Sequence, residues 1–234
     1  MAAPFFFEEN LSAEDEFVLS EETSRHVVQV LRMKENEQII LTNGNGYTKT
    51  AEIIFPDKKK TKVKVVHSEF HEHKKSKTAI AISLVKNNNR FEWFLEKATE
   101  IGVSAIIPLI CKRTEKTHFR LDRMKSILIS AMLQSQQSWL PEISEPAKFS
   151  DVIRNEKYGQ KFIAHCINEE KRELKDVLEK SSSKIILIGP EGDFTEEEIK
   201  NAIEKKYLPV SLGDTRLRTE TAGLVAAVLL KSAI

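Results

Sequence analysis

Two hydrophobic patterns follow one another along the chain, and the change between them falls near residue 78. Residues 1–72 contain short runs in which apolar and polar positions alternate, the period of strands that bury one face. Strands are predicted at 38–43, 47–55 and 61–70, with a Gly-Asn-Gly turn at 44–46, and a helix is predicted near 21–32 from Val27, Val28, Val30 and Leu31. Short strands around tight turns favour a small barrel or a compact antiparallel sheet.

From residue 78 onward, continuous apolar runs alternate with stretches of helical period. Strands are predicted at 78–85, 104–111, 161–166, 184–189 and 208–213. Helices are predicted at 91–101 (ended by Gly102), 121–132, 169–180, 195–206 (started by a Thr195–Glu198 capping box) and 220–233. This alternation is typical of the α/β class, a mostly parallel sheet with helices on both faces. The polar stretch 71–77 is the predicted boundary, so we expect domains at 1–72 and 73–234.

Composition adds limits to this picture. The 234 residues suffice for one large or two small domains, and 41% hydrophobic residues suit a globular protein. No apolar run approaches the roughly 18 residues of a membrane span, and the N-terminus does not resemble a secretory signal. The two cysteines, Cys111 and Cys166, lie in apolar runs, and we expect both to be buried in a protein of the reducing cytoplasm.

The net charge of +1 hides a gradient along the chain. Residues 51–130 carry 17 basic and 9 acidic side chains, a net charge of +8, whereas residues 1–50 carry 4 basic and 9 acidic, a net charge of −5. The near-neutral total excludes a nonspecific RNA coat protein. The basic segment either tracks a phosphate backbone or protects an edge strand with lysines. The candidate RNA-binding residues are Arg25, Arg32, Lys58, Lys60, Lys62 and Lys64.

Other side chains in the first half leave similar choices open. Phe5, Phe6 and Phe7 either stack on bases or pack in a first strand, and the second interpretation is favoured because apolar aromatics are mostly buried. His71 and His73 have no second ligand pair at a zinc spacing, so we predict no metal site.

Two loops after predicted strands hold the candidate chemistry. After strand 184–189 comes a glycine-containing loop, Gly189-Pro190-Glu191-Gly192, which matches neither a phosphate loop nor a dinucleotide fingerprint. It is either a ligand loop at a strand's carboxyl end or an ordinary turn. After Ser211-Leu212-Gly213 come Asp214, Arg216, Arg218 and Glu220, which form either a structural ion pair or a substrate site.

Together, GPEGDF (189–194) and LGDTRLRTETA (212–222) resemble the two cofactor loops of the RsmE family. Its members are SPOUT-superfamily methyltransferases that methylate N3 of a uridine in 16S ribosomal RNA. The resemblance extends over nearly the whole chain through FFF (5–7), HVVQVLR (26–32), NGNG (43–46), RFEWFLEKATEIGVSAIIPL (90–109) and QSQQSWLPEI (134–143). It implies an α/β knot, with a deep C-terminal trefoil knot in the domain at 73–234, and a PUA-like β-barrel that binds RNA at 1–72. It also implies a homodimer that acts on the small ribosomal subunit.

The resemblance further implies S-adenosylmethionine as cofactor, held by loops after strands 161–166, 184–189 and 208–213. The implied cofactor-binding residues are His165, Ile188, Gly189, Pro190, Glu191, Gly192, Ser211, Leu212, Gly213, Leu217, Thr221 and Ala222. For His165 a core position remains an equal alternative. The chain departs from the family pattern at Asp193 (usually Gly), at Asp214 (usually Pro) and at Leu133-Gln134-Ser135-Gln136-Gln137 (usually Glu-Gln-Ser-Gly-Arg).

The expected reaction is a direct methyl transfer to the uracil nitrogen, which must first lose its proton. We expect Arg218 to stabilise the developing negative charge, and Glu220 or Glu191 to orient it or to accept the proton. A purely structural Arg218–Glu220 pair remains open. So do a different target nucleotide within the SPOUT superfamily and a ribosome-assembly factor that binds RNA without turnover.

Overall fold

The computed structural model describes residues 3–72, 77–154, 156–167, 169–180 and 182–232. Two compact units make up the chain: Met1–His73 with Met132–Leu140, and Lys74–Ala131 with Pro141–Ile234. The basic residues at 74 and 75 and the second histidine of the His71–His73 pair lie outside the described residues. No helix within the described ranges is long and apolar enough to cross a membrane.

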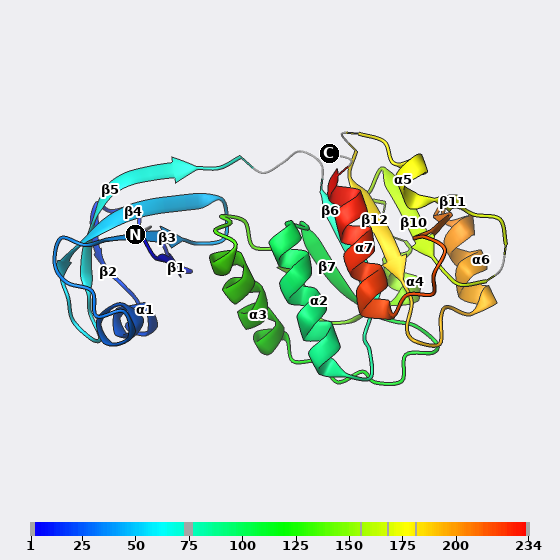
Figure 1. Cartoon of the computed structure of the whole chain (residues 1–234), viewed down its shortest axis with the longest axis horizontal. Coiled ribbons are helices and arrows are strands. Elements are labelled where there is room, and N and C mark those ends of the chain that lie inside the picture. The colour runs from blue at the N-terminus through cyan, green and yellow to red at the C-terminus, as the bar shows by residue number, and fades with distance from the viewer. Residues whose placement is uncertain (1–2, 73–76, 155, 168, 181, 233–234) are drawn as a thin grey trace. The chain divides into compact units, whose positions relative to one another are not determined.

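The first unit is built on a strongly curved sheet (Figure 1). Its strands are β1 (Phe5–Phe7), β2 (Glu16–Val18), β3 (Gln38–Thr42), β4 (Tyr47–Phe55) and β5 (Lys62–Phe70), in the order β1-β3-β4-β5-β2. All pairs are antiparallel except β1 with β3. The inward positions Phe6, Val27, Ile39 and Val63 are buried together, which confirms the predicted alternation.

The helix predicted near 21–32 begins as expected but changes its winding. α1 (Glu21–Arg25) starts at Ser20, whose hydroxyl accepts a hydrogen bond from the amide of Thr23. The carboxylate of Glu8 accepts hydrogen bonds from the amide and the hydroxyl of Ser20, which fixes this start. The next turn, η1 (His26–Val30), is π-helical, and Arg32 follows with a positive φ of 55°.

The second unit holds a parallel sheet whose strands run in the order β11-β13-β10-β12-β6-β7-β8, with β9 also paired to β7. The strands are β6 (Thr78–Ser83), β7 (Ala105–Ile110), β8 (Glu142–Ile143), β9 (Ala147–Lys148), β10 (Gln160–Ala164), β11 (Arg172–Glu173), β12 (Lys184–Ile188) and β13 (Leu208–Ser211). Every residue of β6 and β12 is buried, as their largely apolar sequences predicted.

Helices cover both faces of this sheet. α2 (Asn88–Ile101), α3 (Leu121–Gln134) and α7 (Thr219–Ser232) stand side by side in Figure 1. α2 and α7 meet over Ile82, where a methyl group on Gly223 would lie 2.7 Å from both Ile82 Cδ1 and Phe94 Cε2. Ala79 and Ala81 point to the opposite face, where they pack with residues of α4 (Phe149–Val152) and α6 (Glu196–Glu204). The predicted α/β architecture is confirmed.

The helix predicted at 169–180 is wrong. Arg172–Glu173 pairs with β13 as strand β11, and only the single turn α5 (Leu174–Val177) is helical. Glu173, at the N-cap, makes no side-chain cap, and Leu174 is the only buried residue of the turn. This highly charged segment has too few apolar positions to hold a longer helix against the sheet.

The segment Met132–Leu140, which begins in the last turn of α3, belongs to the first unit. Its Trp139 indole donates a hydrogen bond to the carbonyl oxygen of His71 at 2.8 Å. Gly46, in the predicted Gly-Asn-Gly turn, faces the same ring, and a side chain there would lie 2.5 Å from Trp139 Cζ2. The glycine is therefore required by close packing as well as by its φ of 88°.

Candidate functional site

Three loops follow neighbouring strands of the second unit at the same edge of the sheet. β10 lies between β12 and β13 and is parallel to both, so the loops after Ala164, Ile188 and Ser211 emerge together. Ligands of open α/β sheets bind at this edge, beyond the carboxyl ends of the strands. The three loops are the ones that the sequence predicted to hold the cofactor.

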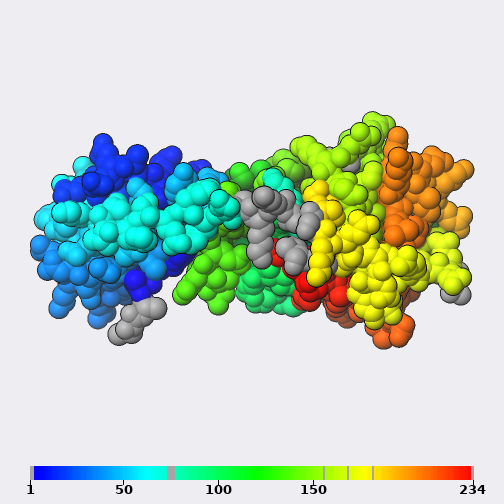
Figure 2. Space-filling model, turned by 90° about the horizontal axis from the view of Figure 1, so that it is seen from above, coloured from blue at the N-terminus to red at the C-terminus, as the bar shows by residue number. Residues whose placement is uncertain are grey.

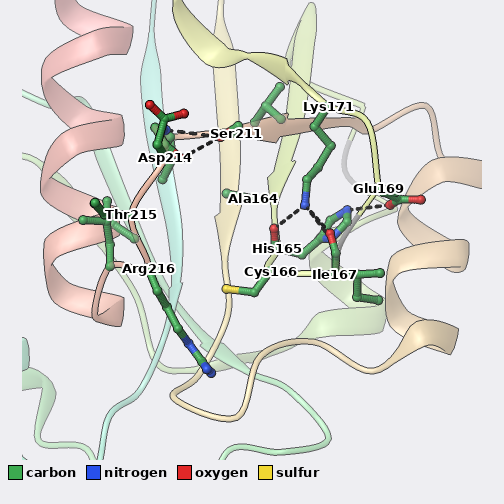
Figure 3. A pocket seen from close by; sticks show the side chains of 15 residues that line it. Ala164, His165, Cys166, Ile167, Glu169, Lys171, Ser211, Asp214, Thr215 and Arg216 are labelled. Carbon is green, nitrogen blue, oxygen red and sulfur yellow. Dashed lines mark hydrogen bonds and ion pairs between the residues drawn. The ribbon is translucent and has the colours of Figure 1, made fainter.

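A cavity of about 420 Å³ lies between the loops that follow β10 and β13 (Figure 3). This volume is within the range of small-molecule sites. Apolar side chains from Ala164, Val210, Leu217 and Ala222 line one part of it, and polar groups line the rest. Four predicted cofactor-binding residues contribute to its wall besides Leu217 and Ala222: His165, Ser211, Leu212 and Gly213.

Lys171 holds the first loop in shape. Its ammonium group donates hydrogen bonds to the carbonyl oxygens of His165 at 2.6 Å and Ile167 at 2.7 Å, as the dashed lines of Figure 3 show. The His165 ring beside it is buried, and its Nε2 atom, although 3.2 Å from Glu169 Oε1, has no well-aligned hydrogen-bond partner among the described residues. Burial and then the Lys171 charge lower the pKa of His165, so a neutral ring is favoured.

Asp193 joins two of the loops. Its carboxylate accepts hydrogen bonds from the amide of Cys166 at 2.7 Å and from the amide of Phe194 at 2.8 Å. The backbone of Asp193 has a φ of 61°, a left-handed conformation that aspartate tolerates better than most residues. The loop after β10 is thereby fixed to the loop after β12.

A second cavity, of about 250 Å³, shares Ala164, Cys166, Arg216, Leu217 and Ala222 with the first. Its remaining wall brings together the side chains that were predicted to act in the reaction, Glu191 and Arg218, with Arg90 of α2. One carboxylate oxygen of Glu191 accepts a hydrogen bond from the amide of Lys86 at 3.0 Å. Three arginines (Arg90, Arg216 and Arg218) and two carboxylate residues (Glu191 and Asp193) therefore border one space.

Glu220 has a different place from Glu191. It is buried at the start of α7 and does not line either cavity, and its nearest ion-pair partner is Arg90, with Nε 3.7 Å from Oε1. The neighbouring Thr219 hydroxyl donates a hydrogen bond to the carbonyl oxygen of Gly189 at 3.0 Å. The start of α7 thus contacts both α2 and the loop after β12.

Most of the predicted cofactor-binding residues line the two cavities, with Ile188, Gly189, Pro190 and Glu191 in the second. Gly192 and Thr221 line neither; the Gly192 carbonyl instead accepts a hydrogen bond from Arg113. Cys166 was expected to be buried, and this prediction is wrong, because it is exposed and lines both cavities. Cys111 is buried as predicted.

The candidate RNA-binding residues lie in the first unit. Arg25 pairs with Glu21 at 2.9 Å and Lys62 pairs with Glu16 at 3.0 Å. Lys58 and Lys60 lie in the turn before β5, where the carboxylate of Asp57 accepts hydrogen bonds from the backbone amides of Lys59 and Lys60. Lys64 points outward from β5, which forms much of the visible surface of this unit in Figure 2.

Family models match most of the chain. A model described as an RNA methyltransferase domain matches residues 71–231, and a model described as an RNA methyltransferase PUA domain matches residues 19–66. Ribosomal RNA small subunit methyltransferase E of Bacillus subtilis is 29% identical over 224 residues, which cover 90% of this chain and 87% of the relative.

Solved structures agree with these matches. A probable rRNA-methyltransferase of Porphyromonas gingivalis is 33% identical, with a TM-score of 0.92 and 98% of each chain covered. Ribosomal RNA small subunit methyltransferase E of Neisseria gonorrhoeae, solved with S-adenosyl methionine, is 30% identical, with a TM-score of 0.87 and coverage of 99% of this chain and 98% of the other.

Proposed function

Since the chain belongs to the RsmE family of RNA methyltransferases, we propose that it transfers a methyl group from S-adenosylmethionine to N3 of a uridine in 16S ribosomal RNA. The observation that carries the proposal is the pair of adjoining cavities at the carboxyl edge of the sheet. One is suited to the cofactor, and the other brings Glu191, Arg218 and Arg90 around a space beside it.

The residues of the larger cavity fit S-adenosylmethionine. Apolar side chains provide a surface for the adenine ring, and main-chain groups of the loops after β10 and β13 line the cavity and are suited to hydrogen bonds with the polar edge of the ring. His165 lines this cavity, and its buried Nε2 atom has no well-aligned hydrogen-bond partner among the described residues, which fits a polar ligand there. When bound, the cofactor supplies a methyl group on a sulfonium sulfur that is already electrophilic, so no covalent enzyme intermediate is required.

The protein must prepare the acceptor nitrogen. Uracil N3 is a weak nucleophile until its proton leaves, and the negative charge then spreads to O2 and O4. We assign the proton acceptor to Glu191, whose carboxylate borders the second cavity, and the stabilisation of the anion to Arg218 on the same wall. Buried Glu220 pairs with Arg90 and acts as a positioning residue for that guanidinium group.

RNA capture is assigned to the PUA-like domain at 1–72 and catalysis to the domain at 73–234. Uridine N3 is hidden in a base pair, so the target nucleotide must be unpaired or flipped out. Exposed Lys58, Lys60 and Lys64 are suited to phosphate contacts, and Arg25, Arg32 and Lys62 are further candidates. The likeness of residues 19–66 to an RNA methyltransferase PUA domain supports this division.

Three further features belong to the same proposal: a trefoil knot in the C-terminal unit, a homodimer, and action on the small ribosomal subunit in the cytoplasm. The knot is supported by the strand order, because β12 lies between β6 and β10 while α7 returns to pack on β6 and β12. The homodimer is supported by the family resemblance and by Trp93 of α2 and Val228 of α7, which are large apolar side chains left exposed.

Mass spectrometry of ribosomal RNA tests the function. Deleting the gene should remove a single 3-methyluridine from 16S rRNA, and the purified protein with S-adenosylmethionine should restore it. An unchanged profile would contradict the proposal, and a loss at another nucleotide would redirect it to another RNA target. No heat of S-adenosylmethionine binding in calorimetry would instead favour an assembly factor without turnover.

Arg218→Ala provides the matching test of mechanism. Arg218 lines the second cavity but not the larger one, which we assign to the cofactor. The variant should therefore lose methylation, while its affinity for S-adenosylmethionine stays within about twofold of the wild-type value. Wild-type turnover of this variant would remove Arg218 from the reaction.

A further inference from the structure

A third cavity of the C-terminal unit, of about 290 Å³, shares no lining residue with the two described above. Its wall comes from the first turns of α2 and α3 and from the loop before α3. The lining residues are Asn88, Asn89, Glu92, His118, Arg120, Arg123 and Met124. Every lining residue except Met124 carries a polar or charged side chain, so the cavity is suited to a polar ligand.

The charge in this cavity is unbalanced. Glu92 is its only acidic residue, and Arg123 binds that carboxylate with two hydrogen bonds, Nε to Oε1 at 2.6 Å and Nη2 to Oε2 at 2.7 Å. This contact lowers the pKa of Glu92, so the pair is fully ionised and its charges cancel. Within the described part of the chain, Arg120 is exposed and makes no ion pair, which leaves the cavity with an uncompensated cation beside His118.

The start of α2 adds to this positive character. Its first turn contains no acidic residue, and its N-cap is the neutral Asn87, whose side chain accepts a hydrogen bond from the Asn89 amide, so no first-turn carboxylate neutralises the partial positive charge at this end of a 14-residue helix. The side chains of Asn88 and Asn89 line the cavity and carry amide donors. Donors around an arginine match the oxygens of a phosphate.

The position of the cavity relates it to the reaction. Arg90 follows Asn89 directly in α2 and lines the cavity that holds Glu191 and Arg218. Consecutive residues of one helix therefore line the two cavities. We propose that the third cavity binds a backbone phosphate of the substrate RNA next to the nucleotide being methylated, an inference that rests on the proposed function.

Such a contact answers a physical requirement of the reaction. A flipped nucleotide is joined to the strand through its flanking phosphates, so holding one of them fixes where the base can enter. Phosphate contacts of this kind set register and orientation and do not read sequence. The Arg123–Glu92 pair joins α3 to α2 and keeps Arg120, three residues earlier, at the rim of the cavity.

The test compares RNA binding of the wild-type protein and Arg120→Ala across a range of salt concentrations. The probe is unmodified 16S rRNA transcribed in vitro. We expect the variant to bind about tenfold more weakly and its slope of log affinity against log salt to shrink by about 0.7–0.9, the value for one lost phosphate contact. Arg120→Lys should keep most of the slope because it keeps the charge. Affinity for S-adenosylmethionine should equal that of the wild type.

Lys125→Ala is the matched control, since Lys125 is an exposed cation in the first turns of α3, five residues after Arg120, and does not line the cavity. Equal slopes for Arg120→Ala and Lys125→Ala would overturn the inference. So would a change in molecular mass of Arg120→Ala in solution, because the cavity would then be a contact between copies of the chain. If the wild type binds the RNA with the expected slopes but methylates nothing, the proposed function fails while the phosphate site stands.

Discussion

Asp193 occupies a position at which the resembled family usually has glycine, and the structure explains how the replacement is tolerated. The left-handed backbone, with φ of 61°, would cost a residue other than glycine roughly 1–2 kcal/mol. The carboxylate offsets this cost through its hydrogen bonds to the amides of Cys166 and Phe194. The substitution thus exchanges backbone freedom for a connection between two cofactor loops.

We therefore expect Asp193→Ala to be worse than Asp193→Gly. Alanine keeps the backbone strain and loses both hydrogen bonds, so the free energy of unfolding should fall by about 2 kcal/mol, whereas glycine loses the bonds but relieves the strain. Chemical denaturation of the two variants and of Asp193→Asn, which retains an acceptor oxygen, measures the difference. Equal losses for alanine and glycine would contradict the account.

His165 makes stability depend on pH in a definite direction. Burial and Lys171 lower its pKa in the folded protein, whereas in the unfolded chain it titrates near 6.5. The unfolded chain therefore binds the proton more readily, and the free energy of unfolding should decrease as pH falls below about 6.5. Lys171, Glu169 and Asp193 are the charged groups that face the ring.

Denaturation at pH 7.5 and at pH 5.5 measures this effect. In His165→Gln the loss of stability between the two values should be smaller than in the wild-type protein, because the titrating ring is absent. A variant that loses as much stability as the wild type would show that other groups carry the pH dependence.

At this scale the sequence revealed some site residues and not others. Arg218 and Glu191, which line the second cavity, were predicted because each lies in a short motif that follows a strand. Arg90 was missed, since it lies far away in sequence and reaches the site only through the packing of α2 against α7. The exposure of Cys166 was missed because the apolar run before it does not reveal where β10 ends.

Helix ends of the same form occur at three places with different residues. After α2, Val103 donates its amide hydrogen to Ala98 O and Gly102 adopts a φ of 84°. The same pattern follows α3 with Gln136 at a φ of 53°, and follows α6 with Lys206 at 64°. Glycine is the usual residue at such a position, so the latter two ends carry strain.

Gln136→Gly and Lys206→Gly should each raise the free energy of unfolding by about 0.5–1 kcal/mol, since relief of the left-handed strain exceeds the added flexibility of the unfolded chain. Both side chains are exposed, so little packing is lost. Gly102→Ala serves as the opposite control and should destabilise by a similar amount. A loss of stability in both glycine variants would contradict the explanation.

The junction of α7 with the sheet predicts an overpacking effect. Alanine favours a helix over glycine by about 1 kcal/mol, yet Gly223→Ala should lower the free energy of unfolding by about 1–3 kcal/mol, because the new methyl group meets Ile82 and Phe94. Thermal or chemical unfolding measures the change. Ser232→Ala, at an exposed position of the same helix, should stay within about 0.5 kcal/mol.

Most elements of the sheet and its covering helices could be predicted, and the exceptions have physical reasons. β6 and β12 are fully buried, and apart from the end residues Thr78, Ser83 and Lys184 their sequences are apolar runs. Two-residue strands such as β8, β9 and β11 have no periodicity of their own and exist only through their partners. The false helix at 169–180 arose from charged residues with good helix propensity but few apolar contacts.

For the whole molecule, the charge gradient predicts how RNA binding responds to salt. Lys58, Lys60 and Lys64 are exposed and, within the described residues, make no ion pair. Replacing all three with alanine should reduce the slope of log affinity for 16S rRNA against log salt by roughly 2, if each contacts a phosphate of a single strand. Replacing Lys148, Lys180 and Lys200, exposed cations of the other unit, should change it much less. Equal slopes for both triple variants would assign RNA capture elsewhere.

At this scale, the sequence did not reveal which segments of the chain pack together in each unit. Periodicity predicts a boundary near 71–77, but it contains no information that Met132–Leu140 packs with the first unit. That pairing depends on long-range contacts: the Trp139 ring lies against Gly46 and donates to the His71 carbonyl, and backbone hydrogen bonds join Gly46 to Ser138 and Leu140 to Gly44.

These contacts have a consequence for how the protein can be divided. A single cut at the linker would leave the N-terminal fragment without Trp139. The C-terminal fragment would then contain residues 132–140 without the N-terminal unit on which they pack. Neither half is therefore a transferable module. Gene fusions, domain swaps and recombination between relatives should succeed only when residues 132–140 are exchanged together with the N-terminal unit, so the two units are constrained to evolve as a pair.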